Sequence, residues 1–521
     1  MTQLINADGR DVTADTLAAF KKAMGDGKGL EKAATISTAQ GLVAYDLEAP
    51  AKNLYPVLTP LRNRIRRETK NTGAGVGPNW NEVSAITGSG ISSMPWVPEG
   101  QRAARMSLTT TPRSASYVTL GEESDVSFEA QSAANGYEDV MSTTGMRLLQ
   151  SLMIKEELAI LGGNRSVALG TPDAPVVTTA NSGGTIPDDP GGYNIRVVAL
   201  TLEGLLAASL ASGVVVTQSI TGLDGQSFTL NGGSSAVSAA GASGAVAGGV
   251  ADKSTLSATV TPIKGAVAYA WYCGKHDIAG GNLPLEAITT INSVKLTALA
   301  GTGQLHNLVT GDHSKNATYA FDGLLYSAFN SSLAYYKAMA TGTAGTGTGL
   351  TASGRGSVVE IDDMLRSFWD NYRLSPEEIY VNAQELQNIS TKSLTASGGA
   401  SLMQVIQPGP GGLGQGAPVM TAGNVVGYYY NPFTLGGGQI IPIKLHPNLP
   451  AGTVFGWAEN LPAYYQSANV PQTASIQCRR DYYQIPWPLV TRANQTGVYS
   501  EEVLKVYAPF AMGIITNIGN G

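Results

Sequence analysis

The feature that most constrains this chain is a long extended excursion that leads directly into a long helical segment. The first limb of the excursion includes Trp80 to Thr87, and the return limb, residues 107–124, is rich in Thr, Ser, Val and Tyr, which favour strands. A Gly/Ser-rich stretch at 88–96 separates the limbs, and residues 71–154 contain no lysine. The pattern predicts a projecting arm of two strands.

The segment behind this arm predicts one long helix. Asp125 or Ser127 can cap its start, apolar residues recur at helical spacing, and Gly162-Gly163 ends it. About 35 residues at ~1.5 Å each give a rod of roughly 50 Å. We expect this rod to bend near Asn135-Gly136 or near Gly145.

Composition excludes several classes of protein. The net charge of -6 and the 14% of charged residues give no sign of nucleic-acid binding by the chain as a whole. Cys273 and Cys478 are the only cysteines, so we expect neither a disulfide framework nor a zinc site. The start of the chain lacks the pattern of a signal peptide, and no apolar run reaches the ~18 residues of a membrane helix.

The first part of the chain and its middle differ in character. Residues 1–50 hold one short helical pattern among small polar residues, which is typical of an arm that packs on something else. Residues 164–316 are rich in small residues and strand formers, and their alternation between 254 and 299 predicts a β-sandwich. Residues 232–250 have few apolar side chains and predict a flexible loop.

The last part of the chain, residues 317–521, has a mixed α/β pattern. Helices are predicted at 358–372 and 383–394, around a strand at 379–382. Further strands are predicted at 425–430, 439–445 and 453–459, with β-rich segments at 480–490 and 502–518.

The sequence carries no constellation that predicts chemistry. There is no nucleophile elbow and no phosphate-binding loop, and the histidines lack metal-ligand spacing. The pairs His276-Asp277 and Asp312-His313 are interpreted as polar residues of surface loops. We therefore predict no catalytic residues, no metal site and no cofactor. The four histidines are His276, His306, His313 and His446.

A basic cluster precedes the extended excursion. The alternation of Arg62, Arg64 and Arg66, followed by Arg67, suggests a strand with one charged face. Such a face can be a solvated edge that resists aggregation, a set of salt bridges to a neighbouring subunit, or a contact with nucleic-acid phosphates.

Five segments of the chain form a recognisable series when they are taken in order. They are ISTAQGLVAYDLEAPAKNLYPVLTPLRNRI (36–65), PWVPEGQRAARMS (95–107), SYVTLGEESDVSFEAQS (116–132), LMIKEELAILGGN (152–164) and VEIDDMLRSFWDNYRLSPEEIYVNAQELQNIS (359–390). Together they resemble the major capsid protein of tailed bacteriophages, which has the Hong Kong 97-type fold. The resemblance covers about residues 36–170 and 320–518.

The resemblance implies an α+β chain of Hong Kong 97 type. Residues 268–272 (AYAWY) and 293–296 (SVKL) look like parts of an immunoglobulin or fibronectin type III module, which we expect to project from the outer surface. The implied division is an N-terminal arm (1–65), an extended loop (66–125), a peripheral domain with a spine helix (126–185), an inserted immunoglobulin/fibronectin-like β-sandwich (186–316), an axial domain (317–475) and a return to the peripheral domain (476–521).

The resemblance also implies a function without catalysis. Copies of the chain would self-assemble into hexamers and pentamers of an icosahedral phage head that encloses double-stranded DNA through non-specific contacts. Portal and scaffolding proteins, and in some phages a decoration protein, would be partners, and no membrane would be involved. The protein would be located in the virion capsid, assembled in the host cytoplasm.

The sequence departs from some relatives in two ways. Only about 35 residues precede the matching arm, which predicts a separate scaffolding protein or a very short internal one. Some relatives join subunits by a Lys–Asn isopeptide bond from the extended loop, but here no lysine lies between Lys70 and Lys155. We therefore expect non-covalent maturation.

Three other functions fit parts of the pattern. A phage tail or adhesin component could carry the same module, but the long helix and the helix–strand–helix segment favour a capsid. An encapsulin-type compartment shell shares the fold, and the insertion argues against it. A hydrolase with a carbohydrate-binding module lacks acid/base spacing. For a capsid, the predicted inter-subunit contacts are Arg62, Arg64, Arg66, Arg67, Trp80, Trp96, Glu99, Arg102 and Arg105.

Overall fold

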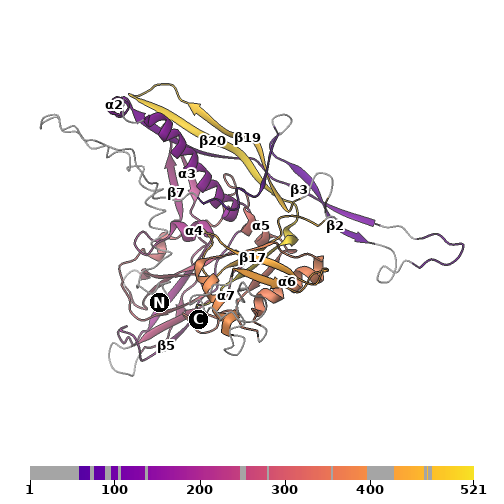
Figure 1. Ribbon diagram of the computed structural model, residues 1–521. Helices are drawn as coiled ribbons and strands as arrows, with labels where there is room; N and C mark the ends of the chain where they lie inside the picture. Colours follow the sequence, from indigo (N-terminus) through magenta and orange to yellow (C-terminus); the bar gives the residue numbers. More distant parts are fainter. Residues whose placement is uncertain are drawn as a thin grey trace, which may run out of the picture.

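The chain has a mixed α+β architecture, seen in a computed structural model (Figure 1). The predicted helical pattern near the N-terminus and the Gly/Pro-rich loop at 397–418 lie outside the described residues. The structure describes residues 58–70, 75–87, 96–103, 107–134, 139–246, 254–278, 281–353, 356–395, 427–462, 466 and 472–520.

A four-stranded sheet lies beside the longest helix. Its order is β1 (Arg66–Thr69), β19 (Ala474–Pro486), β20 (Ala493–Val506) and β4 (Val118–Ser127), so strands from both ends of the chain are neighbours. The helix α3 (Val140–Gly162) packs on β4 and β20. Leu148 and Leu152 of α3 bury against Val498. This packing holds the helix along the sheet.

The predicted single helix over 127–162 is divided into two. Ser127 caps a short helix α2 (Phe128–Ala133), and Asp139 starts α3 by accepting a hydrogen bond from the Ser142 amide. A second cap in mid-segment explains why the rod is not continuous. The predicted end is confirmed, because α3 ends at Gly162. A Cβ at Gly163 would lie 2.6 Å from the Phe321 carbonyl oxygen, so only glycine fits there.

A six-stranded sheet forms the second layer. Its order is β14 (Tyr335–Ala338), β21 (Met512–Thr516), β18 (Val454–Trp457), β15 (Glu378–Val381), β17 (Gln439–Leu445) and β16 (Tyr428–Asn431). The predicted helices are α6 (Val359–Tyr372) and α7 (Ala383–Thr395), and they bury Met364, Phe368 and Ile389 in the same core as one face of this sheet. Of the three C-terminal strands, β19 and β20 lie with α3, whereas β21 joins this second sheet.

Two further sheets face each other in the middle of the chain. One has the order β13 (Ser293–Leu296), β10 (Thr255–Thr259), β5 (Val176–Ala180), and the other β12 (Leu285–Thr289), β11 (Ala268–Lys275), β6 (Tyr193–Leu200), β9 (Gly241–Ala242). Ile195, Trp271 and Leu256 lie in the core between them. This region is not purely β, because it includes α4 (Leu202–Ala207) and a 3-10 turn (His306–Leu308). It also holds a hairpin of β7 (Thr217–Thr221) and β8 (Ser227–Asn231).

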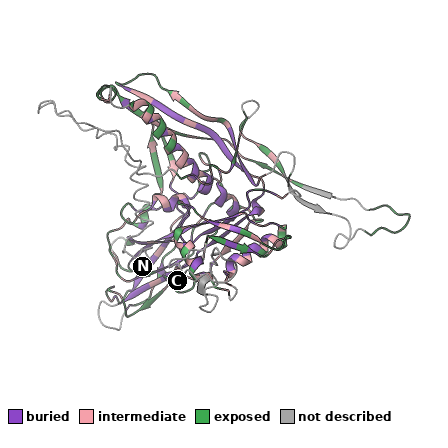
Figure 2. Ribbon diagram, in the orientation of Figure 1, coloured by how far each residue is buried: buried purple, intermediate pink, exposed green. Residues whose placement is uncertain are grey.

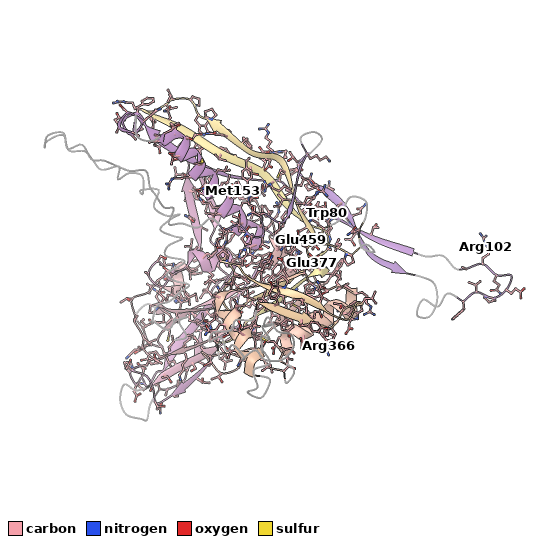
Figure 3. All side chains as sticks on the ribbon, viewed as in Figure 1. Trp80, Arg102, Met153, Arg366, Glu377 and Glu459 are labelled. Carbon is pink, nitrogen blue, oxygen red and sulfur yellow. The ribbon has the colours of Figure 1, made fainter. Side chains whose placement is uncertain are left out.

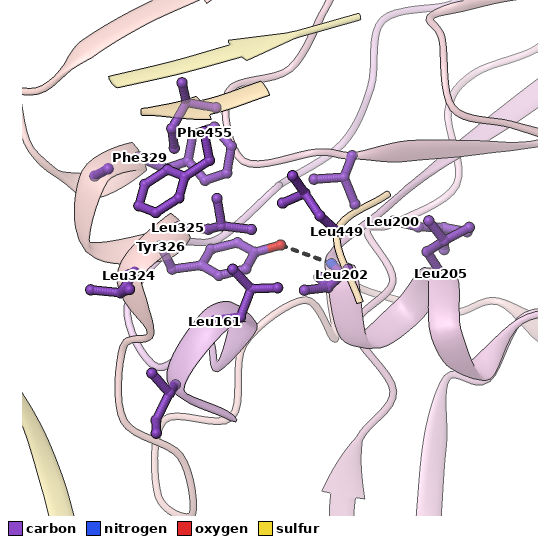
Figure 4. Packing of buried hydrophobic residues seen from close by; sticks show 14 of the residues in the cluster. Leu161, Leu200, Leu202, Leu205, Leu324, Leu325, Tyr326, Phe329, Leu449 and Phe455 are labelled. Carbon is purple, nitrogen blue, oxygen red and sulfur yellow. Dashed lines mark hydrogen bonds between the residues drawn. The ribbon is translucent and has the colours of Figure 1, made fainter. Parts of the chain in front are cut away.

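The sheet that contains β6 and β11 is buried on both faces. Trp271 of β11 faces the three-stranded sheet, whereas Tyr272 belongs to the largest core of the chain. That core also contains Leu161 of α3 and Phe455 of β18, and it includes residues of α5 (Leu324–Asn330) (Figure 4). The predicted insertion therefore shares its core with the rest of the molecule.

The prediction of a flexible loop at 232–250 is wrong for its described part, residues 232–246, which lies along β6. The Ala199 amide donates to Ser235 Oγ at 2.8 Å, the Val197 amide to Ser238 Oγ at 2.9 Å, and the backbone amides of both serines donate back to β6 carbonyls. Serine hydroxyls here replace the carbonyl acceptors of a regular neighbouring strand. The small side chains of this segment allow its backbone to approach β6 closely. A segment with the composition of a loop therefore forms a layer along the strand.

Replacing Ser238 with Ala should therefore destabilise the chain. The substitution leaves the buried Val197 amide without its side-chain acceptor, which costs about 1–3 kcal/mol. Urea denaturation of the Ser238→Ala variant measures this loss. Ser219→Ala, at an exposed position of β7, is the control and should change stability by less than about 0.5 kcal/mol. Equal stability of the two variants would contradict the role of the serine.

Candidate functional site

Arg62, in the turn before β1, and Arg67, within β1, converge on one carboxylate of α3. Arg62 Nε lies 2.7 Å from Glu156 Oε2, and Arg67 pairs with the other oxygen of Glu156. Arg67 also lies 2.8 Å from Glu502 of β20. Both guanidiniums lie over the ring of Tyr482, with Arg62 Cζ 5.1 Å and Arg67 Cζ 4.9 Å from the ring centroid. We call Arg62, Arg67, Glu156, Tyr482 and Glu502 the junction cluster.

The electrostatics of the junction cluster follow from its burial. Burial and the nearby Glu502 raise the pKa of Glu156 to about 7, against the opposing effect of Arg67 and Arg62. Burial tends to lower the pKa of Arg67, but Glu502 and Glu156 outweigh it and the net pKa is raised. Burial likewise raises the pKa of the Cys478 thiol to about 12. The cluster is therefore a set of buried ion pairs, and the raised pKa keeps the neighbouring Cys478 thiol protonated at neutral pH.

The next residue of α3, Glu157, holds the backbone of the same segment. Its buried carboxylate accepts hydrogen bonds from the Leu61 amide at 2.9 Å and from the Arg62 amide at 2.7 Å. His446, just after β17, lies 2.8 Å from the same carboxylate and is also buried. One helical turn thereby contacts both the entering segment and the six-stranded sheet.

A third set of contacts ties this segment to the six-stranded sheet. Arg64 pairs with Glu378 of β15 and lies 2.5 Å from Glu459. Lys444 of β17 shares Glu378. The side chain of Arg64 therefore connects the start of the arm to β15 and to the chain just after β18.

The prediction of a charged strand over Arg62 to Arg66 is wrong for its first half. Residues 60–64 form a turn, closed by the Ile65 amide on the Leu61 carbonyl, and β1 begins only at Arg66. Arg62, Arg64 and Arg67 form ion pairs within the chain, whereas Arg66 is exposed and lies 3.5 Å from Glu68. A role for these arginines in contacts between subunits stays a prediction.

The two predicted limbs form a ribbon that leaves the molecule next to this segment. β2 (Asn79–Thr87) pairs with β3 (Ser107–Ser114), and the two strands form a sheet of their own (Figure 1). The side chains described in the ribbon are mostly exposed (Figure 2). A sheet of two strands without a covering layer is marginally stable in water. The ribbon would therefore gain stability from a covering surface.

The aromatic and charged residues predicted for contacts are separated along the ribbon. Trp80 lies at its base, edge-on to Tyr507 of the same chain with ring centroids 5.8 Å apart. Trp96, Glu99 and Arg102 are exposed, and Figure 3 shows Arg102 far from the body of the molecule. Arg105 lies outside the described residues.

Sequence reasoning missed the two residues that organise the site. Glu156 falls on the apolar stripe of the predicted helix, and a carboxylate on such a stripe is a signal of a buried ion pair. His446 gives no local signal, because its partner Glu157 is distant in sequence. Within the described residues, no group of His, Cys, Asp and Glu could hold a metal ion. No helix in that part of the chain is long and apolar enough to cross a membrane.

Comparison with known proteins gives matches among solved structures only; no protein-family model and no curated protein matches the chain. The capsid of a native GTA particle aligns with 94% of this chain and 99% of its own, at 9% identity and a TM-score of 0.39. The capsid of Myoviridae phage XM1 aligns with 92% of this chain and 100% of its own, at 10% identity and a TM-score of 0.37. The SrpI encapsulin of Synechococcus elongatus PCC 7942 aligns with 90% of this chain and 93% of its own, at 9% identity and a TM-score of 0.33.

Removal of Arg67 should destabilise the subunit strongly. Arg67→Ala leaves Glu156 and Glu502 buried without their shared cation, which costs about 3–5 kcal/mol. The neighbouring Arg66→Ala removes an exposed arginine and should cost less than about 1 kcal/mol. Urea denaturation of the unassembled subunit compares the two. Similar losses in both variants would show that the junction cluster does not carry the stability assigned to it.

The junction cluster should also make stability depend on pH. Because the pKa of Glu156 rises from its ordinary 4.5 to about 7, the folded chain binds a proton there between these pH values and the unfolded chain does not. The free energy of unfolding therefore falls as pH rises through this window, by up to about 3 kcal/mol from this group. Glu156→Gln, whose side chain stays neutral like the protonated acid, should flatten this slope.

Denaturation of the subunit at pH 5, 6, 7 and 8 measures the slope for Glu156→Gln and for the parent chain. Glu99→Gln, at an exposed position near the end of the ribbon, is the matched control and should keep the parent slope. A parallel pH dependence of parent and Glu156→Gln chains would exclude the raised pKa.

Proposed function

We propose that this chain is a major capsid protein whose copies form hexamers and pentamers of an icosahedral phage head around double-stranded DNA. The observation that supports this most is the β2–β3 ribbon, which extends from the body without a covering layer. A ribbon of this kind gains stability when it lies on another copy. In this proposal the ribbon belongs to an extended loop over 66–125 and α3 is the spine helix behind it.

The buried contacts at the start of the ribbon fit the same proposal. A projecting arm transmits force to its base when neighbours bind it, and here the base is held by Glu156, Glu157 and the arginines that they bind. An enzyme would instead concentrate such groups around an open cavity. We assign the six-stranded sheet with α6 and α7 to the axial part of the subunit and the four-stranded sheet with α3 to the peripheral part.

Further partners belong to the proposal as well. Portal and scaffolding proteins would act in assembly, and packaged DNA would make only backbone contacts, since the chain is acidic overall. An encapsulin-like shell is the second candidate function, because the same ribbon would serve it. The contents of purified particles, DNA or protein cargo, separate the two.

Shortening the ribbon tests the proposal. The register pairs Thr87 with Ser107, so replacement of residues 88–106 by Asn-Gly closes the ribbon with a two-residue turn. The parent chain should form closed shells in electron micrographs, and the shortened chain should remain as subunits or small oligomers. On denaturing gels the parent shells should give a single band at 54.0 kDa, because the predicted association is non-covalent.

A matched control shortens a different hairpin. Thr221 pairs with Ser227 at the end of the β7–β8 hairpin, so Asn-Gly can replace residues 222–226 in the same way. This variant should still form shells, and both variants should unfold at the temperature of the parent chain. Normal shells from the chain with the shortened ribbon would refute the role of the ribbon in assembly.

A further inference from the structure

The glycine-rich loop GTAGTGTG (342–349) lies between two parts of the molecule. One part is the sandwich, by which we mean the two facing sheets formed by β5, β6 and β9 to β13. The amide of Gly345 donates a hydrogen bond to Ser293 Oγ of β13 at 3.0 Å. On the other side, the amide of Gly519, after β21, donates to the Thr348 carbonyl at 2.8 Å. A stretch with the composition of a flexible linker is therefore held on both sides.

Two buried asparagines join the same parts of the chain. The amide of Asn292, in the turn between β12 and β13, donates to Asn517 Oδ1 at 2.7 Å. Asn517 Nδ2 donates to the Met339 carbonyl at 2.8 Å, just after β14, and Asn292 Nδ2 donates to Thr341 Oγ1 at 2.8 Å. Both asparagine side chains are buried. We call Asn292, Met339, Thr341 and Asn517 the asparagine latch.

The backbone of Asn517 is left-handed, with a φ of 62°. Most residues with a side chain avoid this conformation, and asparagine is one of the few that adopt it. Within the described residues, Arg373 is the other residue besides glycine with a positive φ, at 54°. Asn517 thus combines a demanding backbone position with side-chain hydrogen bonds to two separate segments.

The sandwich is also attached to α3 and α5. The amide of Leu202, the first residue of α4 after β6, donates to the Tyr326 hydroxyl of α5 at 3.0 Å (Figure 4). Tyr326 in turn donates to the Gly265 carbonyl, before β11, at 3.1 Å. A Cβ at Gly162 would lie 2.3 Å from Leu202 Cδ2, so the last turn of α3 packs directly on the start of α4.

The strand register places both attachments at the same end of the sandwich. β6 meets β11 where Leu200 lies opposite Ala268, and β11 meets β12 where Tyr269 lies opposite Thr289. β6 and β12 are therefore two strand spacings apart, or about 10 Å. The attachment to α3 and α5 lies beyond the end of β6, whereas the asparagine latch lies beyond the end of β12.

The layers on either side of the sandwich also contact each other directly. The four-stranded sheet with α3, which we call the α3 layer, meets the six-stranded sheet where Glu157 contacts His446 at 2.8 Å. Two bodies that are joined at one place can rotate about it, whereas a second attachment at a distance removes this freedom. The sandwich offers such an attachment, because it is fixed to α3 at one point and to the segments after β14 and β21 at another.

We propose that the sandwich is an internal tie that stops the α3 layer from pivoting against the six-stranded sheet. Leu200 and Tyr272 of the sandwich support this tie in the largest core, where they lie among side chains of α3 and β18. The proposal concerns a single copy and holds whether or not copies form a shell. A tied subunit keeps a fixed angle between its two layers.

Distances between two spin labels on the unassembled subunit test the tie. The labels are placed on cysteines that replace Gln150 of α3 and Arg366 of α6, which are both exposed, whereas the natural Cys273 and Cys478 are buried. Asn517→Gly removes the side chain of the latch but permits the same φ. Double electron–electron resonance should give a narrow distance distribution for the parent chain and one at least twice as wide for Asn517→Gly.

The matched control is Arg373→Gly, which changes the other left-handed position at an exposed site and should keep the narrow distribution. A second pair of labels, at Gln150 and Arg492, lies within the α3 layer and should keep its width in every variant. Ser293→Ala removes the acceptor of the Gly345 amide without a change of backbone, and it should widen the first distribution as well. This variant decides the question if Asn517→Gly does not fold.

An unchanged distance distribution between the two layers in the variants that fold would overturn the tie. Equal broadening of the pair within the α3 layer would also overturn it, because the substitutions would then act on the stability of the whole subunit. Failure of the parent chain to form shells would refute the proposed function and would leave these measurements on the single subunit unaffected.

Discussion

The carboxylates of Glu156 and Glu157 are the constraint on which the rest of the structure depends. Successive residues of a helix point about 100° apart, so one turn of α3 presents its two carboxylates to different neighbours. Glu156 binds arginine side chains of the entering segment, and Glu157 binds backbone amides of that segment together with His446. The four-stranded sheet, the base of the ribbon and the six-stranded sheet therefore meet at one point.

Charges in such a place have a cost. A buried ion pair stabilises only when its attraction and hydrogen bonds offset the loss of hydration. Arg67 meets Glu156, Glu502 and Asp481, and Tyr482 covers its guanidinium, so most of its bonding capacity is used. Such a network also fixes the relative positions of the segments that it joins, because a guanidinium and a carboxylate bind each other in few orientations.

The sequence predicts the regular elements well and the site poorly. Helix α6 shows its apolar stripe locally, and β15 is a short apolar run, so both could be placed from pattern alone. The long helix was predicted as one rod with a bend near Asn135-Gly136 or Gly145, whereas the structure has two helices, α2 and α3. The start of α3 depends on Asp139, whose capping role could not be distinguished from that of a polar surface residue. The serine-rich segment along β6 could not be predicted from hydrophobic pattern, because Ser238 packs there by accepting a hydrogen bond with its hydroxyl and not by burying an apolar side chain. Glu378 and Glu459, the partners of Arg64, lie hundreds of residues away in the sequence. The local alternation of arginines was therefore the only signal, and it suggested a strand.

The division between a rigid body and an unsupported arm is also an argument about assembly. Three sheets share one core through strands such as β11, so motion between them would expose apolar surface that folding has buried. The ribbon has no such protection and gains most from a partner. In the proposed assembly, subunits of this kind can associate without unfolding any part of the core, because the ribbon forms a sheet of its own outside it. In that proposal, association adds stability to the ribbon first, since a two-stranded sheet is only marginally stable by itself.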